Sequence, residues 1–238
     1  MKAIELEVAT DAENAGRRAA SILASVARET LVARERFVVA LSGGKTPETM
    51  FRAFAEEDVD WGRVHVLQVD ERIAPPGDPE RNWGQIEEEL LSRVPIAPEH
   101  MHPMPVEARD LEAAARRYAG VLRELAGDPP EIDCVHLGLG ADGHTASLVP
   151  GDPILDNDDA DVGLTEIYHG RRRMSLTFPA LHRARRIVWL VSGASKVKML
   201  ERLLRGDRTI PAGRVPSARA VVVADALAVK KTETENDS

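Results

Sequence analysis

The chain has 238 residues, of which 43% are hydrophobic and 29% charged, with a formal net charge of −8. This length suffices for one full-sized core. The negative charge argues against a general nucleic-acid binder, because phosphate-backbone affinity depends on clustered Lys and Arg. A local cationic pocket could still bind an anionic small molecule. The single cysteine, Cys134, excludes an internal disulfide and a multi-cysteine zinc site within one chain.

The N-terminal segment "MKAIELEVATDAENAG" has no long apolar stretch and meets acidic residues at once, so it does not predict a signal peptide. No later window reaches the apolar length that a membrane span needs. We therefore expect a cytoplasmic protein that does not contact a membrane. The C-terminal residues 230–238 lack apolar periodicity, and we expect a flexible tail there after a single domain over residues 1–229.

Short apolar runs alternate with amphipathic stretches along the chain. The runs expected to be strands are Arg36–Ser42, Val64–Asp70, Ile132–Gly138, Arg186–Ser192 and Arg219–Asp225. Helical periodicity marks Ala12–Leu31 and Ala108–Leu125, while the polar segment Pro150–Gly163 predicts a surface loop. Nearly continuous apolar runs are typical of strands covered on both faces. The alternation predicts an α/β fold with a mostly parallel sheet and helices on both faces.

Four loops that carry glycine, charge or histidine follow the C-terminal ends of expected strands. They are "SGGKTP" (42–47), "DERIAPP" (70–76), "GLGADGH" (138–144) and "SGASK" (192–196). Ligands of open parallel α/β sheets bind at this edge. The pattern therefore predicts one site to which all four loops contribute.

The first loop places Gly43 and Gly44 ahead of a helix, with Thr46 suited to the N-cap and Pro47 to the first helical position. Glycine backbone N–H groups at a helix start could cradle an anion. For an isolated Gly-Gly, a tight turn is the more common explanation. The P-loop pattern GxxxxGK[ST] is absent.

Charged residues of the second and fourth loops are candidate ligands for an anion. Arg72 follows Asp70 at a strand end and could fork two hydrogen bonds onto phosphate or carboxylate oxygens; a solvated turn is the alternative. Lys196 falls in the first turn of a helix, where a positive side chain is unfavourable unless an anion is bound or the side chain points to solvent. The run 171–173 predicts a solvated turn, with the question open whether one arginine turns inward.

The third loop contains the spacing Gly138-x-Gly140-x-x-Gly143, which fits the dinucleotide fingerprint. That function also needs a substantial helix and a strand ending in an acidic residue ~20 residues onward. Here Pro150 leaves barely two helical turns, so we reject a nucleotide cofactor. Metal-binding spacings such as HExxH are also missing around His144, and we expect no metal. Glycines around His144 leave its imidazole room to meet a substrate, although a structural hydrogen bond is the ordinary role of a loop histidine.

Taken together, the four loops resemble the 6-phosphogluconolactonase family. The resemblance covers essentially the whole chain, and "GLGADGHTASLVPG" is its most specific motif. It implies a Rossmann-like α/β fold shared with sugar-phosphate isomerases and glucosamine-6-phosphate deaminase. It also implies hydrolysis of 6-phospho-D-glucono-1,5-lactone to 6-phosphogluconate in the oxidative pentose phosphate pathway, with no metal and no cofactor. The expected partner is this small sugar-phosphate lactone, and a monomer is expected.

The resemblance assigns His144 as the general base. The residues expected to bind substrate are Gly43, Gly44, Asp70, Arg72, Asn82, Gly140, Asp142 and Lys196. Asp142 either orients His144 or closes the turn. The chain departs from the family pattern at Lys45, where Ser or Thr is common, and at Trp83, where Tyr is common.

Two other functions are considered. In the sister deaminase, the histidine loop continues toward Phe-Asn-Glu, whereas this chain has "TASLVPG". The second loop of the deaminase starts with Asp-Glu-Tyr, whereas this chain has Asp-Glu-Arg. Both differences favour the lactonase. A non-catalytic sugar-phosphate sensor would keep "SGG" and "SGASK" but has no need of His144. In the lactonase hypothesis, neutral His144 takes a proton from the attacking water, and backbone N–H groups of the glycine loops, with Arg72, stabilise the oxyanion.

Overall fold

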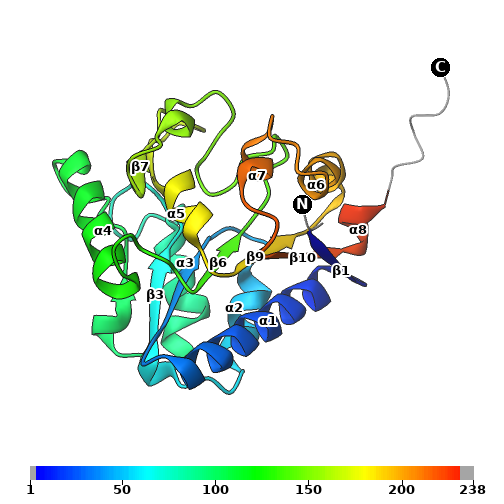
Figure 1. Ribbon diagram of the computed structural model, residues 1–238, viewed down its shortest axis with the longest axis horizontal. Helices are drawn as coiled ribbons and strands as arrows, with labels where there is room; N and C mark the ends of the chain where they lie inside the picture. The colour runs from blue at the N-terminus through cyan, green and yellow to red at the C-terminus, as the bar shows by residue number, and fades with distance from the viewer. Residues whose placement is uncertain (1–3, 231–238) are drawn as a thin grey trace.

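The computed structural model describes residues 4–230, which form a parallel seven-stranded sheet and an antiparallel three-stranded sheet (Figure 1). In spatial order the larger sheet contains β1 (Glu5–Ala9), β10 (Ala220–Asp225), β9 (Ile187–Val191), β6 (Cys134–Leu137), β2 (Phe37–Leu41), β3 (Val64–Gln68) and β5 (Met101–His102). The smaller sheet contains β4 (Asp70–Arg72), β8 (Arg173–Leu176) and β7 (Val162–Leu164). The predicted α/β fold with a mostly parallel sheet is confirmed.

Helices connect the strands and cover the larger sheet. The α-helices are α1 (Ala12–Ala33), α2 (Glu48–Ala55), α3 (Asn82–Glu89), α4 (Leu111–Ala126), α5 (Phe178–Arg183), α6 (Val197–Leu204), α7 (Pro211–Arg214) and α8 (Ala226–Val229). Short 3-10 turns are η1 (Trp61–Arg63), η2 (Leu91–Arg93), η3 (Pro98–His100), η4 (Pro153–Asp156) and η5 (Ala194–Lys196). The helix predicted from Ala108 begins at Leu111 because the Asp110 carboxylate caps it, accepting a hydrogen bond from the Ala113 N–H.

The two faces of the larger sheet pack into separate hydrophobic clusters. Along β2, Phe37, Val39 and Leu41 belong to the cluster covered by α1 and α2. Val38 and Ala40 point the other way, into the cluster that includes α4 and α5. Successive side chains of a strand point to opposite faces, so both sets must be apolar. This explains why the predicted strands are nearly continuous apolar runs.

The run predicted as one strand over Val64–Asp70 is divided between the two sheets. Its first part is β3, which ends at Gln68, whereas Asp70 begins β4. The link is Val69, whose N–H donates to the Leu41 carbonyl and whose carbonyl accepts from the Leu176 N–H. The prediction of a single strand was wrong here, because the backbone leaves one sheet and immediately pairs with another.

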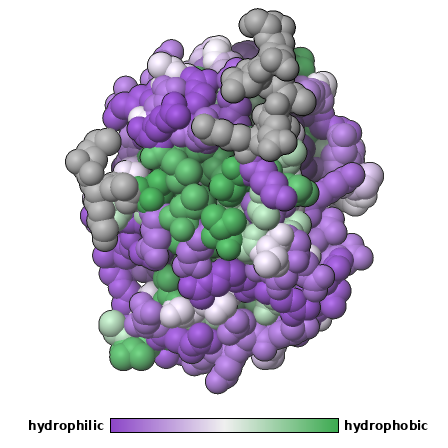
Figure 2. All heavy atoms as spheres, turned by 90° about the vertical axis from the view of Figure 1, so that its right-hand side faces the viewer, coloured by the Kyte–Doolittle hydropathy of each residue, from purple (hydrophilic) through white to green (hydrophobic). Residues whose placement is uncertain are grey.

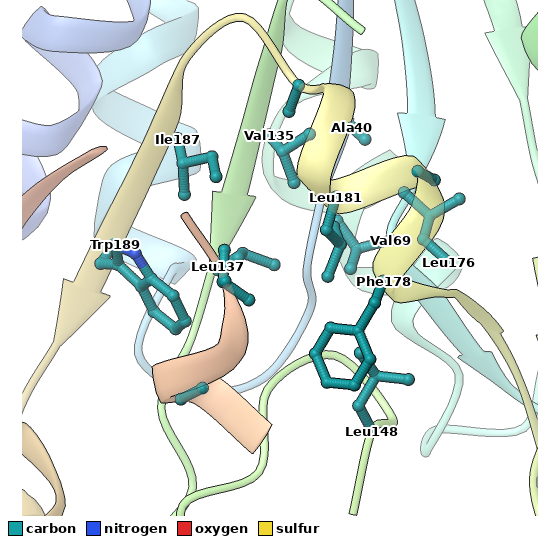
Figure 3. Close-up of a cluster of buried hydrophobic side chains, with 14 of the residues drawn as sticks. Ala40, Val69, Val135, Leu137, Leu148, Leu176, Phe178, Leu181, Ile187 and Trp189 are labelled. Carbon is teal, nitrogen blue, oxygen red and sulfur yellow. The ribbon is translucent and has the colours of Figure 1, made fainter. Parts of the chain in front are cut away.

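The smaller sheet is fixed beside the larger one by apolar packing. Phe178 and Leu181 of α5, which follows β8, lie in the cluster that contains Leu137 of β6 and Trp189 of β9 (Figure 3). All four side chains are at most 1% exposed. Burial of such side chains is worth roughly 1.5–3 kcal/mol each relative to exposure. The packing therefore holds the β7–β8 hairpin close to the larger sheet.

The face that carries β1 and α8 shows a contiguous apolar area (Figure 2). Val8 of β1, with Leu227 and Val229 of α8, is among the exposed large apolar residues.

No helix within residues 4–230 has the length and apolarity to cross a membrane. The tail predicted over 230–238 lies outside the described residues except for Lys230.

We expect the protein to lose stability as the pH falls below about 6.5, the ordinary imidazole value. His136 of β6 is 1% exposed, and burial lowers its pKa to about 3. Between those two values the unfolded chain binds a proton that the folded chain refuses. The free energy of unfolding should therefore fall by up to ~1.4 kcal/mol per pH unit for this histidine. Urea denaturation at several pH values in this window measures the slope.

His136→Asn should reduce the slope, because it removes the group that titrates. The exposed His169 supplies the matched control, and His169→Asn should leave the slope as it is. Identical slopes for the wild type and His136→Asn would contradict the assignment.

Candidate active site

A cavity of about 240 Å³ lies at the C-terminal ends of β2, β6 and β9. Eight of the nine predicted site residues line it: Gly43, Gly44, Asp70, Arg72, Asn82, Gly140, His144 and Lys196. The ninth, Asp142, contacts His144. A larger hollow of about 690 Å³ beside Trp83 has neither histidine nor lysine on its wall. Chemistry rather than volume therefore identifies the smaller cavity as the candidate site.

His144 is held by Asp142 through two hydrogen bonds to the same oxygen. The His144 Nδ1 atom lies 2.6 Å from Asp142 Oδ1, and the His144 backbone N–H donates to that oxygen at 3.1 Å. An ionised carboxylate can only accept, so the contact places a proton on Nδ1 and leaves the Nε2 lone pair free. Burial raises the pKa of Asp142, but the backbone hydrogen bond and the imidazole outweigh it, so the pKa lies below its ordinary value. The pair therefore has the geometry of an oriented general base.

The glycines of the third loop allow the histidine to pack closely. A Cβ at Gly140 would lie 2.1 Å from His144 Nδ1, and one at Gly143 would lie 2.8 Å from Ile210 Cβ. Gly143 also has a positive φ of 88°, a backbone angle that residues other than glycine rarely adopt. Residues 141–152 contain no helix. The spacing that fits the dinucleotide fingerprint thus builds the turn around His144.

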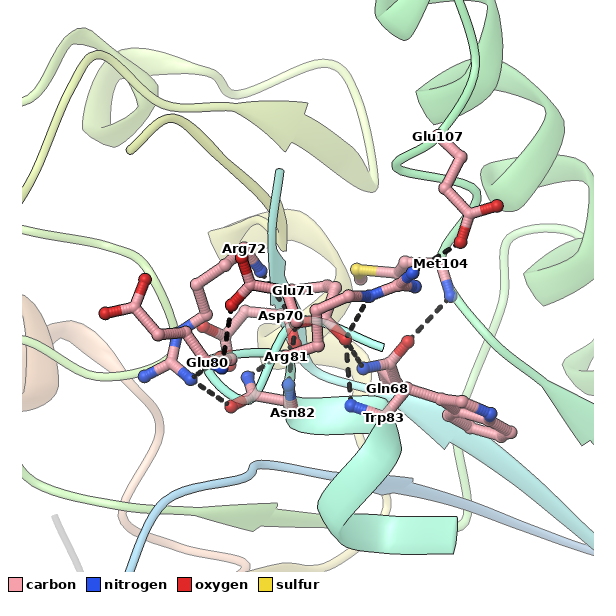
Figure 4. Close-up of polar contacts among 11 residues, drawn as sticks. Gln68, Asp70, Glu71, Arg72, Glu80, Arg81, Asn82, Trp83, Met104 and Glu107 are labelled. Atoms are coloured by element: carbon pink, nitrogen blue, oxygen red, sulfur yellow. Dashed lines mark hydrogen bonds and ion pairs between the residues drawn. The ribbon is translucent and has the colours of Figure 1, made fainter. Parts of the chain in front are cut away.

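Glu71 organises the second loop from a fully buried position (Figure 4). Its carboxylate accepts hydrogen bonds from the backbone N–H groups of Asn82 and Trp83, each at 2.8 Å. These are the first two residues of α3, and an anion at a helix N-terminus satisfies unpaired N–H groups and the helix dipole. Gln68 Nε2 donates a further bond at 2.9 Å. Glu71 therefore joins the two halves of the loop, a role that the sequence analysis did not predict.

Asn82 lies between three other residues predicted for the site. Its Oδ1 accepts from Arg72 Nη1 at 2.8 Å, and its Nδ2 donates to the Asp70 carbonyl at 2.9 Å. A Cβ at Gly43 would lie 2.4 Å from Asn82 Oδ1. The amide thus orients the Arg72 guanidinium, and Gly43 is required for its close approach. The Asp70 carboxylate accepts a 2.6 Å hydrogen bond from Ser147 Oγ.

The arginine run 171–173 contributes one side chain to the cavity. Arg171 forms ion pairs with Asp78, and Arg172 donates to the Thr165 carbonyl, both away from the cavity wall. Arg173 is 8% exposed and lines the cavity. Burial lowers its pKa, and the Asp70 carboxylate opposes this. The alternation of β8 turns Arg173 inward, and this position could not be selected from the sequence because β8 was not predicted.

Four buried polar atoms of residues that line the cavity have no hydrogen-bond partner among residues 4–230: Ser42 Oγ, Arg72 Nε, His136 Nε2 and Arg173 Nε. Most buried polar groups in folded proteins have a partner. Two of these atoms are guanidinium donors, which prefer carboxylate or phosphate oxygens. The wall is therefore suited to an anionic ligand.

Lys196 adds a third positive charge to this wall. It is the last residue of η5, a 3-10 turn that continues directly into α6, so it lies in the first helical turn, as predicted. Burial lowers the pKa of Lys196, and the Asp142 carboxylate raises it. The side chain therefore lies within electrostatic reach of the His144–Asp142 pair.

The first loop differs from two expectations. The N-cap residue of α2 is Pro47 rather than Thr46, and no side chain caps this helix. The Gly44 N–H donates to Gln85 Oε1 at 2.8 Å, so the protein itself uses this donor. The N–H groups of Gly140 and Gly143 are also used, for the His144 and Gly140 carbonyls. These three glycine N–H groups are therefore not free to stabilise an oxyanion.

Within the described part of the chain, no group of three or more His, Cys, Asp or Glu side chains is placed to hold a metal ion. Arg72, Arg173 and Lys196 share the cavity with the oriented imidazole of His144. A parallel α/β sheet with an oriented histidine and three cations around a cavity at its C-terminal edge is suited to the class of proteins that act on small anionic substrates.

The family follows from comparison with known proteins. Residues 10–224 match the family model described as glucosamine-6-phosphate isomerases/6-phosphogluconolactonase, and the chain belongs to this family. A 6-phosphogluconolactonase from Synechocystis is 37% identical over 172 residues, covering 71% of each chain. One from Mycobacterium leprae is 33% identical over 227 residues, covering 91% of each. The resemblance predicted from the four loops is confirmed.

The fold also agrees with a solved structure of the family. The crystal structure of a 6-phosphogluconolactonase from Thermotoga maritima has a TM-score of 0.81 and 27% sequence identity, covering 93% of this chain and 98% of that one.

Proposed function

We propose that the chain hydrolyses 6-phospho-D-glucono-1,5-lactone to 6-phosphogluconate in the oxidative pentose phosphate pathway. The observation that carries the proposal is the His144–Asp142 pair on a cavity whose arginines have donors without a partner in residues 4–230. The relatives from Synechocystis and Mycobacterium leprae bear the name of this activity. The family also contains isomerases. The choice between a lactonase and an isomerase therefore rests on the sequences of the second and third loops and on the test below.

In the proposed mechanism, His144 Nε2 takes a proton from the water that attacks the lactone carbonyl. The Asp142 carboxylate fixes the tautomer and stabilises the imidazolium that forms, since it accepts from Nδ1. The tetrahedral intermediate then collapses, the bond from the carbonyl carbon to the ring oxygen breaks, and the imidazolium returns its proton to that oxygen. Positioned general-base catalysis of this kind is typically worth ~10²–10⁴-fold.

We assign side chains of the cavity to bind the negatively charged groups of the substrate and of the intermediate. Arg173 and Lys196 line the cavity and would bind the phosphate, which orients the carbonyl toward His144. The developing oxyanion is at the other end of the substrate and is assigned to the Arg72 guanidinium, because the N–H groups of Gly44 and Gly140 are already bonded within the protein. This replaces the earlier expectation of backbone donors at these positions.

The test compares two substrates. Hydrolysis of 6-phosphogluconolactone is measured against its uncatalysed opening, and glucosamine-6-phosphate is incubated with the same protein while ammonia release is followed. Faster lactone opening without ammonia supports the proposal. Ammonia release without acceleration would favour a deaminase, and binding of 6-phosphogluconate without any turnover would favour a sugar-phosphate sensor.

Gly140→Ala is expected to lower kcat by roughly 10²-fold, a loss typical of a 1 Å misplacement of a catalytic group. The added Cβ would lie 2.1 Å from His144 Nδ1, so the imidazole must move. Gly120→Ala in α4 is the matched control, because its Cβ meets nothing within 4 Å and Gly120 lies outside the cavity wall. Steady-state rates and thermal unfolding of both variants check this. A Gly140→Ala enzyme as active as the control would show that the close approach is unimportant.

A further inference from the structure

Tyr168 lies at the tip of the hairpin formed by β7 and β8, and the proposed mechanism assigns no role to this tip. The tip is a two-residue turn in which His169 and Gly170 both have positive φ, 49° and 79°. Such turns match the twist of paired strands. The Tyr168 N–H donates to the Arg171 carbonyl at 3.0 Å. The backbone at Tyr168 is therefore fixed by hairpin pairing.

The side chain of Tyr168 contacts three residues of the site. Its hydroxyl donates to Asp142 Oδ2 at 3.2 Å. Its ring meets the His144 ring edge-on, with centroids 5.6 Å apart and planes at 71°. The Arg173 Cζ atom lies 5.1 Å from the centre of the same ring. One side chain thus contacts the proposed base, the carboxylate that orients it and a cation of the cavity.

The two oxygens of Asp142 have different partners. Oδ1 accepts both bonds from His144, and Oδ2 accepts the bond from Tyr168. The Asp142 side chain is 39% exposed, so without Tyr168 its Oδ2 would bond to water and the carboxylate could rotate about its Cβ–Cγ bond. Burial and the Asp142 carboxylate both raise the pKa of Tyr168, which keeps its hydroxyl protonated as a donor.

We propose that Tyr168 is a positioning residue: its hydroxyl fixes the Asp142 carboxylate so that His144 keeps its proton on Nδ1 and its lone pair on Nε2. The inference rests on the proposed function of His144 as general base. Tyr168 acts through Asp142 and needs no contact with the substrate. Its ring adds packing against His144, and its hydroxyl adds the hydrogen bond.

Tyr168→Phe separates these two contributions, because it keeps the ring and removes the hydroxyl. We expect kcat for the lactone to fall by about tenfold, as for a lost hydrogen bond to a charged group, with KM nearly unchanged. Ile167→Ala is the control beside the same tip; Ile167 is 70% exposed and lies outside the cavity wall, so its kcat should equal that of the wild type. An unchanged kcat in Tyr168→Phe would overturn the proposal.

A double-mutant cycle shows whether Tyr168 acts through Asp142. In an Asp142→Ala background, Tyr168→Phe should cause no further loss of kcat, since the acceptor is already absent. The same loss in both backgrounds would mean that Tyr168 acts independently of Asp142 and would overturn the inference.

A second readout does not depend on turnover. Nitrogen NMR of the His144 ring should show the Nδ1–H tautomer in the wild type and a mixture of tautomers in Tyr168→Phe. An unchanged tautomer in Tyr168→Phe would contradict the positioning role. If the wild type fails to hydrolyse the lactone but the tautomer shifts as expected, the proposed function fails while the role of Tyr168 stands.

Discussion

His144→Ala is expected to lower kcat for 6-phosphogluconolactone by roughly 10²- to 10⁴-fold, the usual worth of a positioned general base. The variant loses the Nε2 lone pair that would take the proton from water, whereas the cations of the cavity remain. KM should therefore change little, because an interaction used only in the transition state affects kcat and leaves ground-state binding intact. Initial rates, corrected for spontaneous opening of the lactone, measure the effect.

The fold should tolerate this substitution, since His144 lies in a loop and its side chain is partly exposed. His169→Asn is the matched control: it removes an exposed histidine outside the cavity wall, and asparagine tolerates the positive φ of 49° at this position. Thermal unfolding of both variants should follow that of the wild type. Wild-type turnover by His144→Ala would remove this histidine from the chemistry.

Strands that are covered on both faces could be predicted from the sequence, and strands of the small sheet could not. β2 is apolar at every position, and β10 is apolar at every position except its last, Asp225, because helices cover both faces of the larger sheet. β8 has only four residues, begins with an arginine and is still fully buried. Its pairing partner β4 lies about 100 residues away in the chain. Local periodicity carries no signal for such a long-range pair.

The residues of the candidate site also divide into those that could be predicted from the sequence and those that could not. Predicted residues from all four loops line one cavity, because parallel strands bring their C-terminal ends to one edge of the sheet. Glu71 and Arg173 were missed, since their roles depend on contacts with segments distant in the chain. Glu71 accepts N–H groups from the start of α3, eleven and twelve residues onward. Its neighbours Asp70 and Arg72 were both predicted for the site. The burial of Glu71 between them could not be predicted from the sequence.

Glycine spacing illustrates how one pattern can serve two structures. The fingerprint Gly138-x-Gly140-x-x-Gly143 would let a nucleotide phosphate approach the backbone. Here Gly140 and Gly143 instead make room for His144 and Ile210, whereas Gly138 has open space beside it. The spacing fixes where side chains are missing, and the group that fills the space depends on the tertiary structure.

Arg173→Ala is expected to raise KM for 6-phosphogluconolactone by roughly ten- to a hundredfold, as for the loss of charge-assisted hydrogen bonds. Arg173 lines the cavity with a buried Nε that has no partner within residues 4–230, so the phosphate is its proposed acceptor. Unphosphorylated gluconolactone has no such acceptor, and its kcat/KM should be nearly the same for wild type and variant. Kinetics on the two lactones measure the difference.

Arg172→Ala is the matched control, because this neighbour in the chain bonds to the Thr165 carbonyl and lies outside the cavity wall. Its KM should remain near that of the wild type for both lactones. Arg173→Lys keeps the charge but loses the planar fork of donors, so its KM should lie between those of the wild type and Arg173→Ala. An equal loss of kcat/KM on both lactones would assign Arg173 to the oxyanion or to the support of Tyr168, because only a bond to the phosphate distinguishes the two substrates.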